Sequence, residues 1–491
     1  MPEGNTDYRV VFRSNAVSPG DLLVRSLHGH EALSALYEFE IEVETTFGGP
    51  LEPDDLDALL QQPAAFAFGE QEEHLFHGYV REVELMALAD PTPVVYRLRF
   101  VPKLWDLTMT FGSWVYQDLD APGVVRDVLD NAKWVDGEDY ELRLTGSYPK
   151  YEYKVQYQET DFNFISRVME HEGMFYFFEH GPKKAKLVIT DGNTAFAPRE
   201  GQETLPYEPR QGINGPSEAV TGISRVQRVL TTKVTLKDYN YRTPTTPISG
   251  ASDVDEAGVG EQIYYGEHFK DAAAGKRLAK IRAQEHFVAR EVYRGSTAAR
   301  GLRSGDRFTL EGHPHTALDI DYVVTHVTHS VTQSHTAGET SNDRAYANEF
   351  TAIPYAVPYR APQVTPKPRI VGVIHGRVDA PSDGDRTVPV DEMGRYKVVL
   401  PWDLAGQEGG KASRWIRMAQ PASGGGYGVQ FPLHIGTEVL LIHIDGDPDR
   451  PIIMSSVPNP ATASPVTSAN ASQSMIRTRH GITVTFDDQS G

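Results

Sequence analysis

Cysteine is absent from the 491 residues of this chain. Its absence excludes disulfide bonds, thiolate metal ligands and a thiol nucleophile. Cationic side chains are also few, with 47 Lys and Arg against 67 Asp and Glu and a formal net charge of −20. Because phosphate backbones are bound by clustered Lys and Arg, this balance argues against general nucleic-acid binding. The sequence also lacks any apolar run of about 18 residues, the length that a membrane-spanning helix needs.

The chain length corresponds to about three or four domains, and the acidic residues are spread unevenly along it. Residues 369–460 contain 9 basic and 11 acidic side chains, and residues 461–491 contain 2 of each. The first 368 residues therefore carry a charge of −18. Residues 1–12 lack the basic segment and the following apolar run of a secretory signal peptide. We expect a chain that is made and assembled in the cytoplasm, so any export needs dedicated machinery.

Apolar residues recur mostly at every second position, the period of a strand with one buried face. This alternation predicts strands at residues 37–44, 96–100, 151–157 and 482–486. Apolar stripes with helical spacing are fewer, and they predict helices at residues 124–129, 162–169 and 274–281. In the second helix, Thr160 or Asp161 is expected to cap the start and Gly173 to end it. The pattern indicates a mainly β fold with helical insertions.

Composition marks three segments as connections between folded parts. Residues 243–261 are rich in Gly, Pro, Ser and Thr and indicate a loop. Residues 354–368 contain five prolines, which is typical of a semi-rigid linker. Residues 458–474 are small and polar and predict a second connector. The chain is therefore expected to divide near residues 368 and 460.

Several short motifs resemble ligand sites but lack residues that those sites need. Residues 405–411 (AGQEGGK) lack the first glycine and the Ser or Thr of a phosphate-binding loop. Residues 445–449 space three aspartates like the start of a calcium loop, but Arg450 stands where that loop has glycine. A tight turn is the preferred interpretation. Residues 424–428 (GGGYG) precede no predicted helix, so they indicate a hairpin loop rather than a dinucleotide site.

The titratable and nucleophilic residues form no catalytic constellation in the sequence. His28 and His30 share a strand face, but a pair without a third ligand is weak evidence for zinc. Ser304, in GLRSG, stands one residue late for a nucleophile elbow. The alternating glutamates of residues 38–44 indicate a solvated face rather than paired catalytic carboxylates. The sequence therefore predicts no catalytic, cofactor-binding or metal-binding residue and favours a structural or binding role over an enzyme.

Longer stretches near the C-terminus resemble a known family. Residues 391–403 (DEMGRYKVVLPWD), 413–420 (SRWIRMAQ) and 436–457 (GTEVLLIHIDGDPDRPIIMSSV) follow one another. This order is similar to that of the VgrG proteins, the spike-tip proteins of type VI secretion. The most specific part is a Gly-Asp-Pro-Asp-Arg-Pro turn formed by Gly446, Asp447, Pro448, Asp449, Arg450 and Pro451.

The N-terminal part and the chain end resemble the same family. Residues 157–180 are similar to its Tyr-x-Glu-x-Asp-x-x-Phe helix and aromatic strand, and residues 348–368 to its hub-to-spike connector. Residues 474–491 are similar to the entry of its β-helical needle. The resemblance implies a phage-hub-like pair of β-barrel domains with helical insertions, then an OB-type barrel, then a connector with the start of a trimeric needle. These parts correspond to residues 1–368, 369–460 and 461–491.

The resemblance also implies partners and a route out of the cell. Three chains would surround one axis, sit on the hexameric tube of Hcp and contact baseplate proteins. A PAAR protein would cap the needle, and effector cargo or an adaptor would travel with it. The type VI apparatus would secrete the assembly to the exterior or into a target cell, where it punctures membranes.

Three other functions remain as alternatives. The first is a hub-spike protein of a contractile phage tail or an extracellular injection particle. The second, a hydrolase carried on the spike, is disfavoured because no enzymatic insertion and no two carboxylates in contrasting settings are present. The third, nucleic-acid binding by the barrel, is disfavoured by the barrel's charge of −2 and by its lack of a basic and aromatic groove.

Two features of the C-terminal part carry specific expectations. Arg450 lies among aspartates and is expected to form charge-assisted bonds that hold the turn. Residues 439–444 are apolar at nearly every position, which predicts a strand with both faces covered. Farther on, Ile482, Val484 and Phe486 form an apolar face that has no partner in its own sequence, so other chains are expected to cover it.

Overall fold

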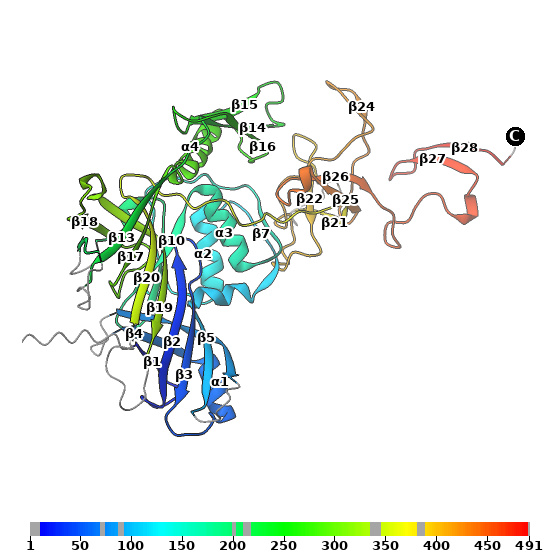
Figure 1. The fold of residues 1–491 in the computed structure, drawn as a ribbon. Coiled ribbons are helices and arrows are strands. Elements are labelled where there is room, and N and C mark those ends of the chain that lie inside the picture. Colours follow the sequence, from blue (N-terminus) through cyan, green and yellow to red (C-terminus); the bar gives the residue numbers. More distant parts are fainter. Residues whose placement is uncertain are drawn as a thin grey trace, which may run out of the picture. The chain divides into compact units, whose positions relative to one another are not determined.

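The computed structural model describes residues 10–68, 74–86, 93–198, 203–209, 218–333, 345–380 and 388–489. The chain divides into two compact units. The first comprises residues 1–109, 121–148 and 165–365, and the second comprises residues 110–120, 149–164 and 366–491. Strands dominate both units (Figure 1), so the expected mainly β class is confirmed.

A 12-stranded sheet forms most of the first unit. Its main path runs β1-β4-β5-β6-β3-β2-β19-β20-β17-β13, and β18 joins at the side by pairing with β19 and β12. The bounds are β1 Val10–Ser14, β2 Leu22–Ala32, β3 Glu38–Thr45, β4 Pro63–Phe68, β5 His74–Met86, β6 Val95–Val101, β12 Thr204–Pro206, β13 Val220–Gln227, β17 Glu291–Thr297, β18 Arg307–Glu311, β19 Asp321–Thr332 and β20 Ala345–Pro354.

The alternation of β3 produces one buried and one polar face. Phe39 is fully buried, and its ring lies 4.8 Å from that of Phe66 and 5.2 Å from that of Phe76, centroid to centroid. Edge-to-face rings at this separation add packing energy beyond the area that they bury. The glutamates of β3 point to the opposite face, where their register partners on β6 include Arg97 and Arg99.

The described residues contain α1 Pro53–Gln61, α2 Ala121–Asn131, α3 Asp161–Glu172 and α4 Ala272–Val288. The last three confirm the predicted helices. Thr160 caps α3 by accepting the N–H of Asn163 at 3.1 Å, and Gly173 follows with φ 76°, a conformation that glycine adopts easily. The prediction missed α1 because only Leu59 of that helix is buried. No helix in the described ranges is long and apolar enough to cross a membrane. Short 3-10 segments are η1 Lys103–Thr108, η2 Asn193–Ala195, η3 Thr316–Leu318, η5 Ile444–Gly446 and η6 Ser468–Asn470.

Two three-stranded sheets complete the first unit. One has the order β10-β11-β8, with β8 Tyr140–Arg143, β10 Phe175–His180 and β11 Ala185–Thr190. The other has the order β15-β14-β16, with β14 Lys233–Asp238, β15 Ile248–Asp253 and β16 Glu261–Tyr265, and α4 packs against it (Figure 1).

The loop predicted at residues 243–261 is wrong, because β15 lies within it. Ile248 is buried in the core that this sheet forms with α4. The remaining residues of β15 are small or polar, so the sequence alone gives them no strand signal.

The second unit contains a four-stranded sheet with the order β22-β21-β25-β26. Its strands are β21 Ile374–Asp379, β22 Lys397–Val399, β25 Glu438–His443 and β26 Pro451–Ser456. Tyr153 and Val155 join the core of this sheet, and β7 Phe111–Tyr116 pairs with β9 Lys154–Thr160. The hairpin of β23 Ala422–Ser423 and β24 Gly428–Val429 confirms the hairpin interpretation of the GGGYG motif.

The strand predicted at residues 439–444 buries one face rather than two. Val439 and Leu441 are completely buried, whereas Leu440 and Ile442 are half-buried. The prediction of two covered faces is wrong in this chain because β25 belongs to an antiparallel sheet, which needs only one packed face.

The proline-rich connector is bound to the first unit along part of its length. The side chain of Arg360 donates to the carbonyl oxygen of Gly173 at 2.8 Å. Thr365 donates its N–H and its hydroxyl to the two carboxylate oxygens of Glu170, at 3.0 and 2.6 Å. These hydrogen bonds hold residues 360–365 of the connector against α3 and the glycine that follows it.

Candidate functional site

The turn between β25 and β26 contains two residues with left-handed backbone conformations. Asp445 and Gly446 have positive φ values of 54° and 73°. A Cβ on Gly446 would lie 3.3 Å from the carbonyl oxygen of Ile370, so glycine satisfies both the conformation and the close approach. The N–H of Arg450 donates to the carbonyl oxygen of Asp447 at 2.9 Å and closes a tight turn.

Asp449 is the most buried carboxylate of this turn, with 1% of its surface exposed. Its Oδ1 accepts the backbone N–H of Val155 at 2.8 Å, and its Oδ2 accepts from Lys154 Nζ at 3.1 Å. Both donors belong to β9. Lys154 precedes Asp449 by 295 residues in the sequence. A third donor, Lys367 Nζ, lies 3.3 Å from Oδ2. The carboxylate therefore ties β9 and the connector to the turn.

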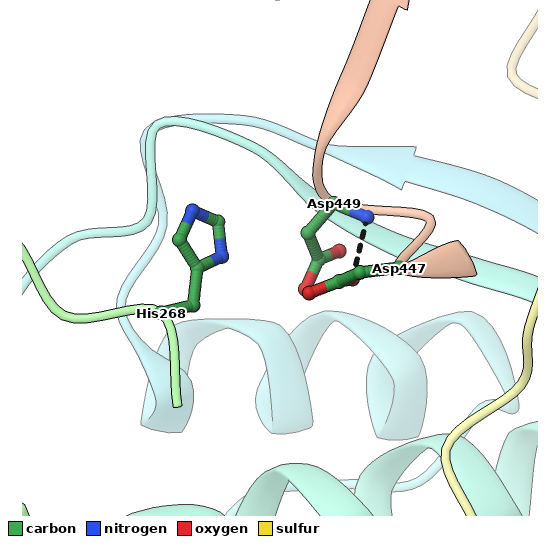
Figure 2. Close-up of side chains that lie close together, drawn as sticks. All are labelled: His268, Asp447 and Asp449. Atoms are coloured by element: carbon green, nitrogen blue, oxygen red, sulfur yellow. Dashed lines mark hydrogen bonds between the residues drawn. The ribbon is translucent and has the colours of Figure 1, made fainter. Parts of the chain in front are cut away.

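Asp447 is the second buried carboxylate of this turn. Its Oδ1 accepts the N–H of Asp449 at 2.9 Å (Figure 2) and lies 2.7 Å from Lys367 Nζ. Its Oδ2 lies 3.6 Å from Arg450 Nε. We call Lys154, Lys367, Asp447, Asp449 and Arg450 the turn cluster. The sequence pointed to Arg450 but not to the lysines, because a lysine at an alternating polar position of a strand normally faces water.

The turn cluster buries Lys154 and Arg450 against the two carboxylates, whereas Lys367 remains 38% exposed. Lys154 is 8% exposed, Arg450 7% and Asp447 9%. Such groups lose their hydration on folding, so removal of one partner leaves a costly buried charge. Burial lowers the pKa of neighbouring His443 to about 4, although Asp447 and Asp449 act in the opposite direction. His443 is therefore neutral at pH 7 and adds no cation. Chemically, this arrangement is suited to holding backbone segments together.

The C-terminal residues form an antiparallel hairpin of β27 Gln473–Arg477 and β28 Thr483–Asp487 (Figure 1). β28 pairs edge to edge with β27, but this pairing leaves the apolar face uncovered. Its side chains remain exposed in the single chain: Ile482 by 73%, Val484 by 49% and Phe486 by 63%. That other chains cover this face stays a prediction. Ile476 lies opposite Val484 and is 50% exposed, and the prediction missed it. We call Ile476, Ile482, Val484 and Phe486 the apolar strip.

The glutamates of β3 form an ion-pair ladder with arginines of β5 and β6. Arg81 and Arg99 each donate to Glu38 at 2.9 Å, and Arg97 donates to Glu42 at 3.2 Å. Burial raises the pKa of the Glu38 carboxyl, but the bonds from the two arginines outweigh this effect and lower it. The alternating Arg97 and Arg99 were the sequence signal for this ladder. The ladder stabilises the polar face of the sheet.

Ser304 belongs to a buried polar group that the sequence did not connect. Its Oγ donates to Glu31 Oε2 at 3.1 Å, and Glu31 Oε1 lies 3.1 Å from His329 Nε2. All three residues are buried. The glutamate stands between the serine and the histidine, so the imidazole does not receive the hydroxyl proton as nucleophilic catalysis requires.

Two protein families match successive parts of the chain. Residues 30–335 match the phage tail baseplate hub (GPD), and residues 385–457 match the type VI secretion system/phage-baseplate injector OB domain. The type VI secretion system spike protein VgrG1c of Pseudomonas aeruginosa is 30% identical over 96% of this chain and 64% of its own length. The chain belongs to the phage tail baseplate hub (GPD) family. The expected resemblance is thereby confirmed.

Further relatives are VgrG proteins of different lengths. VgrG1a of the same organism is 29% identical over 96% of this chain and 73% of its own length. The actin cross-linking toxin VgrG1 of Vibrio cholerae is 27% identical over 96% of this chain but only 44% of its own length. The chain spans 64% and 61% of the P. aeruginosa proteins VgrG1c and VgrG1b.

Solved structures share the fold of this chain. The E. coli c3393 protein, a type VI secretion component similar to the T4 bacteriophage tail proteins gp27 and gp5, matches with a TM-score of 0.66 and 22% identity. The match covers 91% of this chain and 99% of that one. A chain of the Francisella PdpA-VgrG complex matches with a TM-score of 0.62 and 10% identity over 98% of this chain and 83% of its own. The expected hub-and-spike fold is confirmed, and the trimeric needle stays a prediction.

Proposed function

We propose that the chain is the structural spike protein of a type VI secretion system, which caps the Hcp tube and helps to puncture target membranes during effector delivery. The observation that carries this proposal is the order of the two family matches, a baseplate hub followed by an injector OB domain in one chain. P. aeruginosa relatives that align with nearly the whole chain are named type VI spike proteins.

The proposed assembly is a homotrimer with a hub at residues 1–368, an OB barrel at 369–460 and the needle entry at 461–491. The apolar strip supports it, because its side chains are about half exposed or more in a single chain. Full burial of such a side chain is worth about 1.5–3 kcal/mol, against an association cost of several kcal/mol. Three copies meeting at one axis would cover the strip.

The proposed partners are the Hcp tube, baseplate proteins, a PAAR protein at the tip and effector cargo or an adaptor. In this role the turn cluster holds the barrel in shape and binds no ligand, and the chain performs no catalysis. The folded protein is expected to leave peptidoglycan and phospholipid substrates unchanged. Turnover that disappears on substitution of one Asp or Glu, with folding intact, would contradict the non-enzymatic role.

Secretion of Hcp tests the main proposal. In the source bacterium, deletion of the gene is expected to abolish release of Hcp into the medium, and the wild-type chain is expected to restore it. Val484→Asp places a charge in the apolar strip and is expected to fail. Thr485→Asp is the matched control, because Thr485 is also exposed but lies on the other face of β28. Normal Hcp release without the gene would overturn the proposal.

A second candidate is a hub-spike protein of a contractile phage tail or an extracellular injection particle. The phage tail baseplate hub match supports it. The two candidates differ in where the assembled protein is found. Free particles in the culture medium that contain this chain and a sheath would favour the second candidate. Hcp-dependent export from intact cells would favour the first.

A further inference from the structure

The sheet β15-β14-β16 ends in an exposed edge strand. Within the described residues, β16 pairs only with β14. Gln262 and Tyr264 of β16 lie opposite Val234 and Leu236 of β14, whose side chains face the α4 core. Ile263 and Tyr265 alternate with Gln262 and Tyr264 along β16 and therefore face away from α4. Ile263 is 58% exposed and Tyr265 65%. A large apolar side chain and an aromatic one thus lie in water along this edge.

The backbone of β16 also points outward at alternate residues. The N–H of Gly266 donates to the carbonyl oxygen of Lys237 on β14 at 3.1 Å. Because successive backbone groups of a strand point to opposite edges, Gln262 and Tyr264 share the direction of Gly266. The N–H and C=O groups of Glu261, Ile263 and Tyr265 therefore point to the open edge. They form a template for one more strand.

The edge lacks the devices that usually prevent strand addition. The strand EQIYY contains no lysine and no proline, and its register with β14 shows no bulge. Isoleucine and tyrosine have high strand propensity. The opposite edge, β15, consists of ISGASD and presents small side chains instead. The apolar and β-forming residues are concentrated on the edge that is open.

We propose that the β16 edge is a docking site for an extended strand of a partner protein. The partner strand would place apolar side chains beside Ile263 and Tyr265 and basic side chains toward the end that begins at Glu261. Residues 255–267 contain four carboxylates and no Lys or Arg. Asp255 is paired with Arg290 at 2.5 Å, whereas Glu256 and Glu261 are exposed and leave this end acidic. Main-chain bonds supply affinity in such strand addition, and alternate side chains supply specificity.

A partner fits this edge better than a second copy of the chain. Pairing of β16 with another β16 is a twofold contact, in which the same surface serves on both sides. A threefold assembly leaves one of three such edges unpaired. The preference for a partner over a second copy rests on the homotrimer proposed above, whereas the open edge itself does not.

The test uses the full-length protein and a blocked peptide that alternates lysine and valine. Fluorescence anisotropy is expected to show saturable binding. The same peptide with every backbone amide N-methylated keeps every side-chain charge but has no N–H group to donate on either edge, and it is expected not to bind. Ile263→Lys is expected to weaken binding about tenfold or more, because it removes an apolar contact with the bound strand and places a cation, a known block to strand addition, on the edge. Ser249→Lys adds the same charge on the exposed β15 edge and is expected to keep the affinity.

Hydrogen exchange identifies the edge directly. Bound peptide is expected to protect the amides of Glu261, Ile263 and Tyr265 and to leave those of Gln262 and Tyr264 unchanged. Equal binding of the N-methylated peptide, or equal loss in Ser249→Lys, would reduce the interaction to charge attraction and overturn the proposal. Ile263→Lys is expected to leave the oligomeric state unchanged in native mass spectrometry. A loss of trimer in this variant would instead make β16 an interface between copies.

Discussion

Asp449→Asn tests whether the turn cluster holds the barrel together. The side chain of Asp449 is buried, accepts from Lys154 and from the backbone N–H of Val155, and forms an ion pair with Lys367. Asparagine keeps the shape and one acceptor for the backbone N–H. It replaces the other oxygen with an amide that points its own protons at two ammonium groups. The substitution therefore leaves the buried ammonium group of Lys154 with one carboxylate fewer.

Breaking a buried ion pair from one side costs about 3–5 kcal/mol, and the retained backbone bond lowers our expectation to about 3 kcal/mol. For a unit of this size, 1 kcal/mol corresponds to roughly 2–4 °C, so the melting temperature of the second unit is expected to fall by about 6–12 °C. Scanning calorimetry measures this shift. Hydrogen exchange at β9 reports the local effect.

Asp445→Asn is the matched control in the same turn. Asp445 is exposed and has a positive φ that asparagine tolerates, so the change is expected to stay within about 0.5 kcal/mol. Lys154→Met combined with Asp449→Asn is expected to cost about 1–3 kcal/mol less than the sum of the single changes, because the two side chains interact directly. Equal melting of the Asp445 and Asp449 variants would refute the reasoning.

Three further perturbations follow from other contacts. Arg450→Ala is expected to destabilise the barrel by about 1–3 kcal/mol and to lower its melting temperature by a few degrees, with Hcp capture unchanged. Val484→Asp is expected to shift trimers to monomers in native mass spectrometry, because the strip then carries a charge. The second unit is expected to lose stability below pH 6.5, where its unfolded chain binds a proton at His443 that the folded chain takes up only near pH 4. This loss approaches about 3 kcal/mol at pH 4 and is expected to be absent in His443→Gln.

Each of these expectations has a contrary outcome. Unchanged melting with lost Hcp capture would assign Arg450 to an interface. A trimer that survives Val484→Asp would show that the hub and barrel suffice without the apolar strip. The same pH slope in wild type and His443→Gln would exclude this histidine as the titrating group.

Local periodicity carried much of the fold prediction. The alternation of residues 37–44 and 96–100 corresponds to β3 and β6, and the helical stripe at 162–169 to α3. These predictions succeed because burial of one face is a property of each segment's own spacing. The turn of residues 446–451 was also found from the sequence, because Gly and Pro restrict the backbone locally.

Tertiary structure decided the rest. The sequence could not show that Lys154 would be buried against Asp449, that β27 would pair with β28, or that a small polar segment would become β15. In each case the deciding partner lies elsewhere in the chain, 295 residues away for Lys154. The sequence by itself determined the strand and helix periods, the turn chemistry and the family. Whether a polar side chain is buried, or a segment with little strand propensity becomes a strand, depends on residues that only the folded chain brings next to it. The local sequence does not identify those residues.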